Sequence, residues 1–442
     1  MDFKNKATRI NLFSLGSPQM RAFHLTWFAF FLCFFGWFGI VPLMKGDNGV
    51  IATLGLTPAQ VGNTVIAAVF ITIFARLGIG AILDRFGARI TYTWLLILGS
   101  LPVMLIGLSQ NYTHFLIARL LIGVIGGAFV ITQYHTSVMF APNVVGTANA
   151  TTAGWGNLGG GVTQAVMPLI LAAVLTFGAE PIFGWRIAMV IPGIALFLTG
   201  IAYYFFTQDA PDGNYDELRA KGEMPTREHH KGAFWEAVKD RRVVALFFIY
   251  AACFGVELTI NGTAALYFFD RFGLNVATAG LVASLFGLMN IFARSLGGIF
   301  SDKLNQQRGL KGRVQFLFVC LFLEGIALMF FSQLGALAFA IPILIVFSLF
   351  VQMSEGATYS IVPYINKRAL GPVAGIVGAG GNFGAVMAGF LFKGQMPFEQ
   401  AYLIVGALVL GCSFLAFAVR FSPEQEQVAR NEMLERLAGA GD

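Results

Sequence analysis

The sequence predicts an all-helical polytopic membrane protein with twelve transmembrane helices. Three observations carry this prediction: the composition, twelve apolar segments, and a repeat at half the chain length. The 442 residues are 57% hydrophobic and 12% charged, with a mean hydropathy of +0.72. A soluble protein carries about 25% charged residues, so the composition excludes a soluble enzyme and a nucleic-acid-binding protein.

The apolar segments alternate with short polar breaks, and each approaches or exceeds the roughly 20 residues that cross a bilayer. Residues 24–207 and residues 243–421 contain six segments each, so we expect two six-helix bundles joined by a polar loop at 208–242. Residues 1–23 and 422–442 are the polar terminal segments. The segments lie near 24–44, 61–83, 91–110, 114–138, 147–176, 187–207, 243–268, 277–301, 313–333, 336–360, 371–392 and 400–421.

The basic residues indicate how these segments are oriented. With the amino terminus inside, 22 of the 29 Lys and Arg residues lie on the inner side, 4 on the outer side and 3 within spans. The positive-inside rule describes this asymmetry. We therefore expect a multi-pass protein of the inner or plasma membrane, with both termini and the central loop in the cytoplasm. The basic pI of about 9.2 then requires no nucleic-acid partner.

Cysteine usage and the absence of other motifs narrow the expected chemistry. The four cysteines lie in apolar segments without paired spacing, which predicts neither a disulfide framework nor a metal site. We find no nucleotide-binding or catalytic constellation in the sequence. We therefore expect a protein that is not an enzyme, uses no cofactor and works as a monomer.

An internal repeat relates the two groups of spans. Residues 74–85 and 292–303 share Phe-Ala-Arg, Gly and Asp at an offset of 218 residues. Residues 156–159 (GNLG) match residues 381–384 (GNFG) at an offset of 225. Parallel six-helix repeats build transporters whose substrate site lies near the bilayer midplane. The repeat therefore predicts two pseudo-symmetric bundles and favours a transporter over a receptor.

Two arginines occupy equivalent positions inside the repeats. Arg76 and Arg294 lie eight residues before Asp84 and Asp302, which places them roughly 12 Å along a helix from the inner ends of their spans. Two facing guanidiniums repel unless an anion lies between them, and their forked donors match a planar oxyanion. The pair predicts a small anionic substrate. The alternative is that each arginine pairs with an intramembrane glutamate or a carbonyl group.

The junction of the second and third spans, residues 80–89, reads GAILDRFGAR, a GxxxDRxGxR pattern. Here the chain resembles the major facilitator superfamily, which implies two six-helix bundles around a central cavity. The second copy, residues 298–308, keeps the Gly, the Asp and a basic residue but loses the later glycine spacing. The residues expected to hold one closed state together are Asp84, Arg85, Arg89 and Asp302.

Two glycine-rich segments indicate one family within this superfamily. Residues 153–164 read AGWGNLGGGVTQ and residues 375–384 read GIVGAGGNFG. They look like the paired signature motifs of the nitrate/nitrite porter family within the superfamily, and the similarity extends through most of the chain. By position, the resemblance implies that a planar anion is bound by Arg76, Arg294, Phe129, Tyr250, Phe254, Asn157, Phe34, Asn382, Gly154 and Gly378. Phe35 or Trp37 could take the place of Phe34. The glycines expected to let helices 5 and 11 flex or slide are Gly156, Gly159, Gly381 and Gly384.

Three residues are candidates for coupling. Tyr250, Phe254, Glu257 and Asn261 follow a 4, 3, 4 spacing that places them on one helix face. Glu257 on this face is a candidate proton carrier, or a structural residue bonded to a neighbouring helix, and Glu355 is the second carboxyl candidate. Arg119, followed by glycines four and eight residues later, resembles a superfamily coupling motif or serves close helix packing.

The expected function is uptake of nitrate, alone or together with nitrite, across the cell membrane by alternating access. Proton-coupled symport is favoured because Glu257 is titratable and an inward-negative potential opposes anion entry. Nitrate/nitrite antiport is the main competing mode. Two further functions fit the sequence less well, namely a nitrate sensor that does not transport and a carrier for organic anions.

Overall fold

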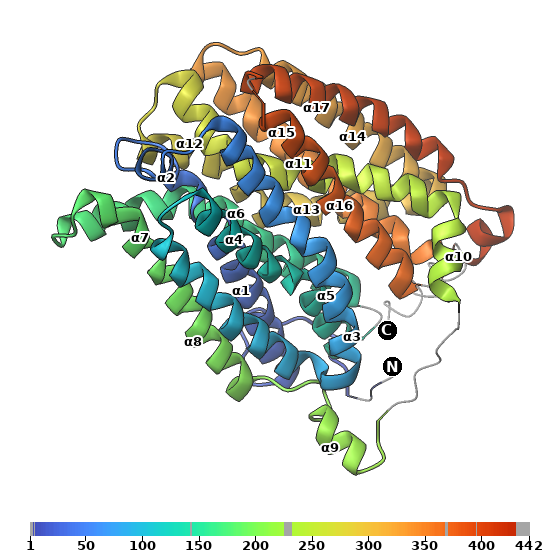
Figure 1. Cartoon of the computed structure of the whole chain (residues 1–442). Helices are drawn as coiled ribbons and strands as arrows, with labels where there is room; N and C mark the ends of the chain where they lie inside the picture. Colours follow the sequence, from blue (N-terminus) through green and yellow to red (C-terminus); the bar gives the residue numbers. More distant parts are fainter. Residues whose placement is uncertain are drawn as a thin grey trace. The chain divides into compact units, whose positions relative to one another are not determined.

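Twelve helical segments of the chain are long and apolar enough to cross a membrane, as the sequence predicts. The computed structural model describes residues 3, 5–141, 144–224, 232–366, 370–394 and 396–429 (Figure 1). Across these ranges the only extended pairing is two isolated β-bridges. The all-helical prediction is therefore confirmed.

The α-helices follow one another with short breaks. Their bounds are α1 Pro18–Phe38, α2 Val50–Leu54, α3 Pro58–Leu105, α4 Tyr112–Ile122, α5 Ala128–Met139, α6 Val145–Thr176, α7 Gly184–Ala188, α8 Val190–Phe206, α9 Tyr215–Ala220, α10 Ala233–Lys239, α11 Arg241–Phe272, α12 Val276–Leu288, α13 Ala293–Arg308, α14 Leu310–Ser332, α15 Leu337–Ile361, α16 Leu370–Phe392 and α17 Phe398–Ser413. Short 3-10 segments are Val41–Leu43, Ile106–Leu108, Gly123–Gly127, Pro181–Phe183, Met289–Ile291, Val362–Tyr364 and Phe414–Ala418.

The chain divides into two compact units. Unit 1 contains Met1–Arg227, Ile260–Ile291 and Gly389–Gln395, and unit 2 contains Glu228–Thr259, Phe292–Ala388 and Met396–Asp442. The long helix α11 therefore belongs to both units: its first part lies in unit 2 and its second part in unit 1.

Unit 1 is held together by close approach of glycine-bearing helices. α1 packs along α6, and Gly159 of α6 lies against the Phe31 backbone of α1 so closely that a Cβ would not fit. Gly161 of α6 lies against Gly287 of α12, backbone to backbone. Small residues permit this approach in membrane proteins, where van der Waals packing and not the hydrophobic effect drives helix association.

The turn between the second and third spans, inside α3, is fixed by a carboxylate from beyond the sixth span. Gly87 leaves the helical conformation with φ +81°, and Asp209 accepts from the backbone N–H of Arg89 at 2.7 Å and of Tyr215 at 3.1 Å. A Cβ on Gly87 would collide with the Asp209 carboxylate. Burial raises the pKa of Asp209, while these two N–H donors and the Arg89 charge oppose that shift. Asp209 thereby caps the helical segment that starts after Gly87.

Unit 2 has an equivalent arrangement, in which a carboxylate beyond the last span caps the start of a helix that follows a glycine with positive φ. Gly309, with φ +67°, separates α13 from α14, and Glu426 accepts from the backbone N–H of Leu310 at 2.9 Å and of Lys311 at 3.2 Å. A Cβ on Gly309 would collide with the Glu426 carboxylate. The second copy of the loop motif therefore keeps a glycine with positive φ, displaced along the sequence.

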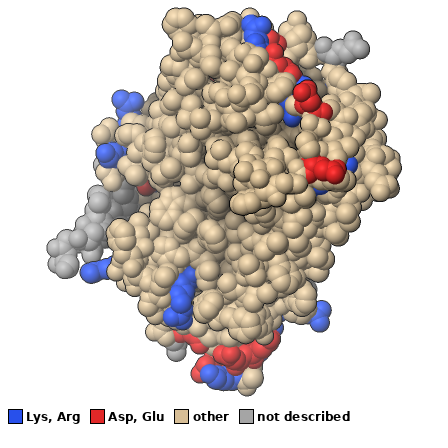
Figure 2. Space-filling model, turned by 90° about the vertical axis from the view of Figure 1, so that its left-hand side faces the viewer, with Lys and Arg blue, Asp and Glu red and all other residues tan. Residues whose placement is uncertain are grey.

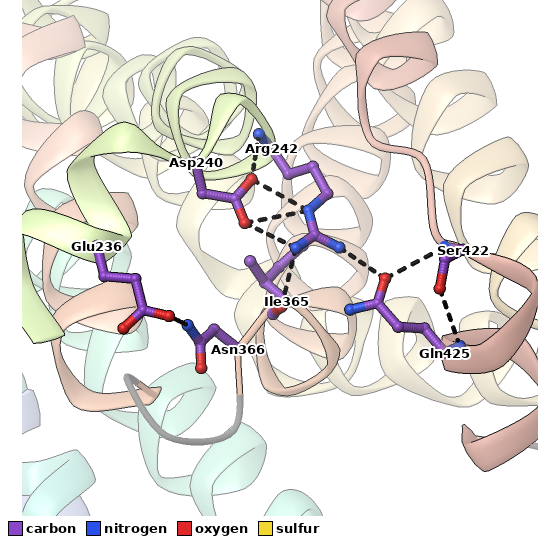
Figure 3. Close-up of polar contacts among 7 residues, drawn as sticks. All are labelled: Glu236, Asp240, Arg242, Ile365, Asn366, Ser422 and Gln425. Carbon is purple, nitrogen blue, oxygen red and sulfur yellow. Dashed lines mark hydrogen bonds and ion pairs between the residues drawn. The ribbon is translucent and has the colours of Figure 1, made fainter. Parts of the chain in front are cut away.

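A second network in unit 2 ties the start of α11 to the carboxyl-terminal segment (Figure 3). Arg242 donates to the Asp240 carboxylate at 2.7 Å, to the Gln425 side-chain oxygen at 3.0 Å and to the Ile365 carbonyl at 3.1 Å. Asp240 also accepts from the Arg242 backbone N–H at 2.8 Å and so caps α11. The short α10 lies before it, with Phe234 and Trp235 exposed.

The outer surface is largely uncharged. Most of the face drawn in Figure 2 carries neither Lys and Arg nor Asp and Glu. Large apolar side chains such as Leu77, Leu98, Phe205 and Phe339 are more than half exposed. Large exposed apolar area of this kind faces lipid in a membrane protein and would cause aggregation in water.

Candidate functional site

In unit 2, Arg294 begins the second half of a broken span. After α12, residues Met289–Ile291 form a 3-10 turn and Phe292 leaves the helical conformation, so that α13 starts at Ala293. Arg294 is therefore in the first turn of α13 and is 3% exposed. The unpaired N–H groups of a helix start carry partial positive charge, which adds to the guanidinium charge. This position attracts an anion.

Both arms of the Arg294 guanidinium have protein partners. One arm forms an ion pair with the Glu355 carboxylate on α15, and the other donates to the Tyr250 hydroxyl on α11 at 3.0 Å. The Glu355 side chain is fully buried. The structure thus brings together three of the residues singled out in the sequence, Arg294, Tyr250 and Glu355, and it gives Arg294 the carboxylate partner that was the alternative to anion binding.

Two further aromatic rings pack against Tyr250, the hydroxyl partner of this arginine. Tyr250 and Phe254 stack with their ring centroids 5.2 Å apart and their planes 16° apart. Tyr359 on α15 meets Tyr250 edge to face at 5.1 Å and donates to the Ala374 carbonyl at 3.3 Å. Sequence reasoning missed Tyr359, because one tyrosine in an apolar span has no distinguishing pattern.

Two further carboxyl groups lie near the ion pair. The carboxyl of Glu257, one turn after Phe254 on α11, interacts with that of Glu355. Glu324 on α14 is fully buried, and neither carboxyl oxygen has a hydrogen-bond partner among the described residues. The thiols of Cys253, Cys320 and Cys412 and the hydroxyl of Ser354 are close enough to Glu324 to interact with it electrostatically.

The second glycine signature packs against α11 next to these rings. A Cβ on Gly381 would enter the Phe254 ring, and one on Gly384 would meet the Ala251 carbonyl. Gly378 lies against Tyr359, whose hydroxyl would be 2.9 Å from an added Cβ. Asn382 is fully buried, and neither atom of its amide has a hydrogen-bond partner in the described part of the chain. Such buried, unsatisfied polar groups mark a place where water or a ligand binds.

In unit 1, Arg76 lies against a second broken span. α4 ends at Ile122, a 3-10 turn follows over Gly123–Gly127, and α5 starts at Ala128. The Arg76 guanidinium donates to the Gly126 carbonyl at 3.4 Å and lies 5.0 Å from the Phe129 ring centroid. Arg76 is 8% exposed. The sequence-predicted pair of Arg76 and Phe129 is therefore brought together.

The aromatic residue that joins Phe129 from the first span is Phe30. Its ring centroid is 5.9 Å from that of Phe129 and 4.9 Å from that of Phe34. Phe34 is fully buried and extends the cluster, while Trp37 donates to the Ala68 carbonyl at 3.0 Å. Sequence reasoning chose Phe34 and missed Phe30, one turn earlier, because the many phenylalanines of this span give no clear helical face.

The first glycine signature packs against the same helix α1. A Cβ on Gly156 would enter the Phe30 ring. Gly154 and Asn157 are buried on α6 as well. Further along α6, Gln164 donates to the Asn261 carbonyl at 2.9 Å, and a Cβ on Gly160 would be 2.9 Å from the Asn261 amide nitrogen.

The remaining sequence candidates have structural partners. Arg119 is buried and donates to the Trp37 carbonyl at 2.8 Å, a contact typical of helix packing. Arg89 lies over the Tyr204 ring at 4.6 Å, and Arg85 lies over the Phe86 ring at 5.2 Å. Asp302 pairs with Arg313 at 2.6 Å. The side chain of Asp84 lies outside the described residues.

The twelve apolar spans and the two buried arginines, each next to a helix break, are typical of a polytopic transporter. The sequence matches the model of the Major Facilitator Superfamily over residues 26–366. A solved bacterial homolog of the human lysosomal transporter Spinster, in its inward-facing and occupied conformation, has a TM-score of 0.66 at 16% identity, covering 91% of this chain and 98% of that one. The predicted fold class is confirmed.

Similar sequences identify the family within this superfamily. High affinity nitrate transporter 2.5 of Arabidopsis thaliana is 40% identical over 93% of this chain and 82% of its own length. High-affinity nitrate transporter 2.3 of Oryza sativa is 36% identical over 95% and 81%. The nitrate/nitrite transporter NrtP of Nostoc punctiforme is 30% identical over 91% and 92%. The chain belongs to the nitrate/nitrite porter family of the major facilitator superfamily.

Proposed function

We propose that this protein transports nitrate across a membrane by alternating access, with Arg76 and Arg294 binding the anion. The observation that carries the proposal is the equivalent setting of the two arginines. Each is buried inside a span, next to a helix break and beside aromatic rings. The choice of nitrate as the substrate is inferred from the names of the relatives.

The chemistry of the two arginines suits a small planar anion. A guanidinium offers parallel N–H donors in one plane, which match the oxygens of an oxyanion. The surrounding phenylalanine and tyrosine rings are flat and remove water, which favours a weakly hydrated ion such as nitrate over a strongly hydrated one. A bulky organic anion would need more polar partners than these rings offer.

We propose that transport is coupled to protons through the Glu257 and Glu355 carboxyl groups. Uptake of nitrate against an inward-negative potential requires a co-transported cation or a counter-transported anion. The orientation that fits this direction of transport has both termini and the central loop in the cytoplasm. The competing mode is exchange of nitrate for nitrite, which needs no titratable group.

The experiment is transport by the purified full chain in liposomes that contain a pH-sensitive dye. External nitrate is added with no internal nitrate or nitrite, and nitrate uptake and internal pH are followed together. Symport predicts acidification that requires nitrate. Uptake that occurs only when nitrite is loaded inside, without acidification, would establish exchange. Absence of nitrate movement under both conditions would refute nitrate transport.

The arginines are tested in the same assay. Arg76→Lys and Arg294→Lys keep the charge but lose the planar fork, so we expect each to reduce uptake by about 100-fold or more. Arg241→Lys is the matched control, because Arg241 is exposed at the start of α11. Uptake that survives either substitution inside a span would remove that arginine from the binding site.

A further inference from the structure

The guanidinium of Arg294 is already paired with an anionic side chain of the protein, the carboxylate of Glu355. The Glu355 carboxylate contacts one arm of the guanidinium, and the Tyr250 hydroxyl contacts the other. The Arg294 side chain is 4% exposed and the Glu355 side chain is fully buried. A carboxylate and a nitrate ion are both flat oxyanions with similar spacing of their oxygens, so they compete for the same N–H donors.

Charge counting shows what must happen when nitrate replaces this carboxylate. The groups that interact with Glu355 are Arg294 from α13, Tyr250, Cys253 and Glu257 from α11, and Glu324 from α14. They include one cation and two other carboxyl groups. If nitrate bound Arg294 while Glu355 stayed ionised, a buried carboxylate would lose its cation, which costs several kcal/mol.

We propose that Glu355 is the internal counterion of Arg294 and takes up the coupled proton when nitrate displaces it. This inference rests on the proposed nitrate transport and assigns its proton to one residue. In the step, the hydrogen bonds from the Arg294 N–H groups to Glu355 break and equivalent bonds to nitrate form. A proton from the aqueous phase bonds to the Glu355 carboxylate. One anion and one proton enter together, so the net charge of the buried cluster does not change.

Glu355 differs from Glu324 in one decisive contact. The Glu355 carboxylate forms a direct ion pair with Arg294 and so occupies N–H donors that nitrate needs. Glu324 is equally buried, also lies in unit 2 and interacts with Glu355, but neither of its carboxyl oxygens has a hydrogen-bond partner among the described residues. Glu324→Gln is therefore the matched control for Glu355→Gln: each removes one buried carboxyl group, and only the second removes the competitor at Arg294.

The test measures proton uptake on nitrate binding to the purified full chain in detergent. Nitrate is titrated calorimetrically in two buffers of different ionisation enthalpy, and in weak buffer with a pH indicator. The wild-type protein and Glu324→Gln should take up about one proton per nitrate, and their Kd should rise by at most about tenfold per pH unit where Glu355 is ionised, the limit for one linked proton. Glu355→Gln should bind nitrate without proton uptake and without this pH dependence.

The outcomes separate the inference from the proposed function. No nitrate binding by the wild-type protein would refute the proposed function. Nitrate binding without proton uptake by the wild-type protein would overturn the inference and leave nitrate recognition intact. Proton uptake retained in Glu355→Gln, or lost in Glu324→Gln, would overturn the assignment to Glu355.

Loss of Glu355 leaves Arg294 buried without a carboxylate, so Glu355→Gln is purified in saturating nitrate. The same logic gives a second readout. Nitrate should raise the melting temperature of Glu355→Gln more than that of the wild-type protein, because nitrate supplies the missing anion. An equal or smaller rise would count against Glu355 as the internal counterion.

Discussion

The two equivalent arginines have different described contacts in the two halves of the chain. The six spans before residue 207 contain no Asp or Glu, whereas the later six contain Glu257, Glu324 and Glu355 in their interiors. Arg76 in unit 1 is held by a carbonyl group and a ring, while Arg294 in unit 2 is held by a carboxylate and a hydroxyl. A repeat can thus preserve a charge while changing what balances it.

This difference teaches how one duplicated residue can have two roles. A carbonyl dipole and a ring quadrupole stabilise a guanidinium without cancelling its charge. A carboxylate does cancel the charge, so we expect Arg294 to bind an anion only by exchange with Glu355. We therefore expect unit 2 to provide the step that depends on protons.

The strongest test of this difference between the halves is to neutralise each arginine. Arg294→Gln leaves Glu355 buried without its cation, and we expect the free energy of unfolding to fall by about 3–5 kcal/mol. Arg76→Gln removes a carbonyl hydrogen bond and a ring contact, for which we expect about 1–3 kcal/mol. Thermal unfolding in detergent measures both. Arg241→Gln is the exposed control, and equal losses at Arg76 and Arg294 would contradict the asymmetry.

The glycine signatures should instead behave alike in the two halves. Gly156→Ala drives a Cβ into the Phe30 ring, and Gly381→Ala drives one into the Phe254 ring. We expect each to cost about 1–3 kcal/mol by overpacking and to slow nitrate uptake in liposomes. An added Cβ at Gly78 or Gly411 would meet no atom within 4 Å, so Gly78→Ala and Gly411→Ala are the controls. An effect confined to one half would show that only one signature needs close packing.

Tyr250→Phe tests the hydroxyl that shares Arg294 with Glu355. The substitution removes one hydrogen bond to a charged group and keeps the ring, so we expect the KM for nitrate to rise by about tenfold. Tyr92→Phe is the control in unit 1, because the buried Tyr92 hydroxyl contacts Thr132 at 3.0 Å and, among the described residues, no arginine. An unchanged KM in Tyr250→Phe would limit that hydroxyl to a structural role.

The smallest effect is expected at the network of Figure 3, which lies in unit 2. Burial acts to raise the pKa of Asp240, but the hydrogen bonds and charge of Arg242 outweigh it, so the pKa lies below its ordinary value of 3.8. The stabilisation is therefore complete above about pH 5 and is lost as pH falls through the lowered pKa. Asp240→Asn should cost about 1 kcal/mol or less, with the same loss at every pH from 5 to 8 in thermal unfolding. A loss that changes across this range would contradict the lowered pKa.

The twelve spans and the two arginines could be predicted because their signals are local. Apolar length identifies a span, and a charge inside a span is rare enough to be noticed. The repeat then paired Arg76 with Arg294. The aromatic residues Phe129, Tyr250 and Phe254 followed from the family resemblance. In the structure, the Phe129 ring lies by Arg76, the Tyr250 hydroxyl accepts from Arg294, and Phe254 stacks on Tyr250.

The rest depends on contacts that no short pattern contains. The helix breaks before Ala128 and Ala293 lie in apolar sequence that hydropathy cannot divide. The pairing of Arg294 with Glu355 joins residues 61 positions apart. Gly309 was hidden because it lies 222 residues after Gly87, four more than the offset of the preceding motif, so the positive φ is kept where the spacing is not.

The carboxylate caps at Gly87 and Gly309 also order events during synthesis of the chain. Asp209 follows the sixth span and Glu426 follows the twelfth, so each cap reaches back over four spans made earlier. Because the chain is made from its amino end, the turn at Gly87 stays uncapped until the sixth span has been inserted. The turn at Gly309 waits in the same way for the twelfth span. Each half thus carries a contact that forms only when its last helix has arrived, so a chain that stops short leaves one helix start uncapped.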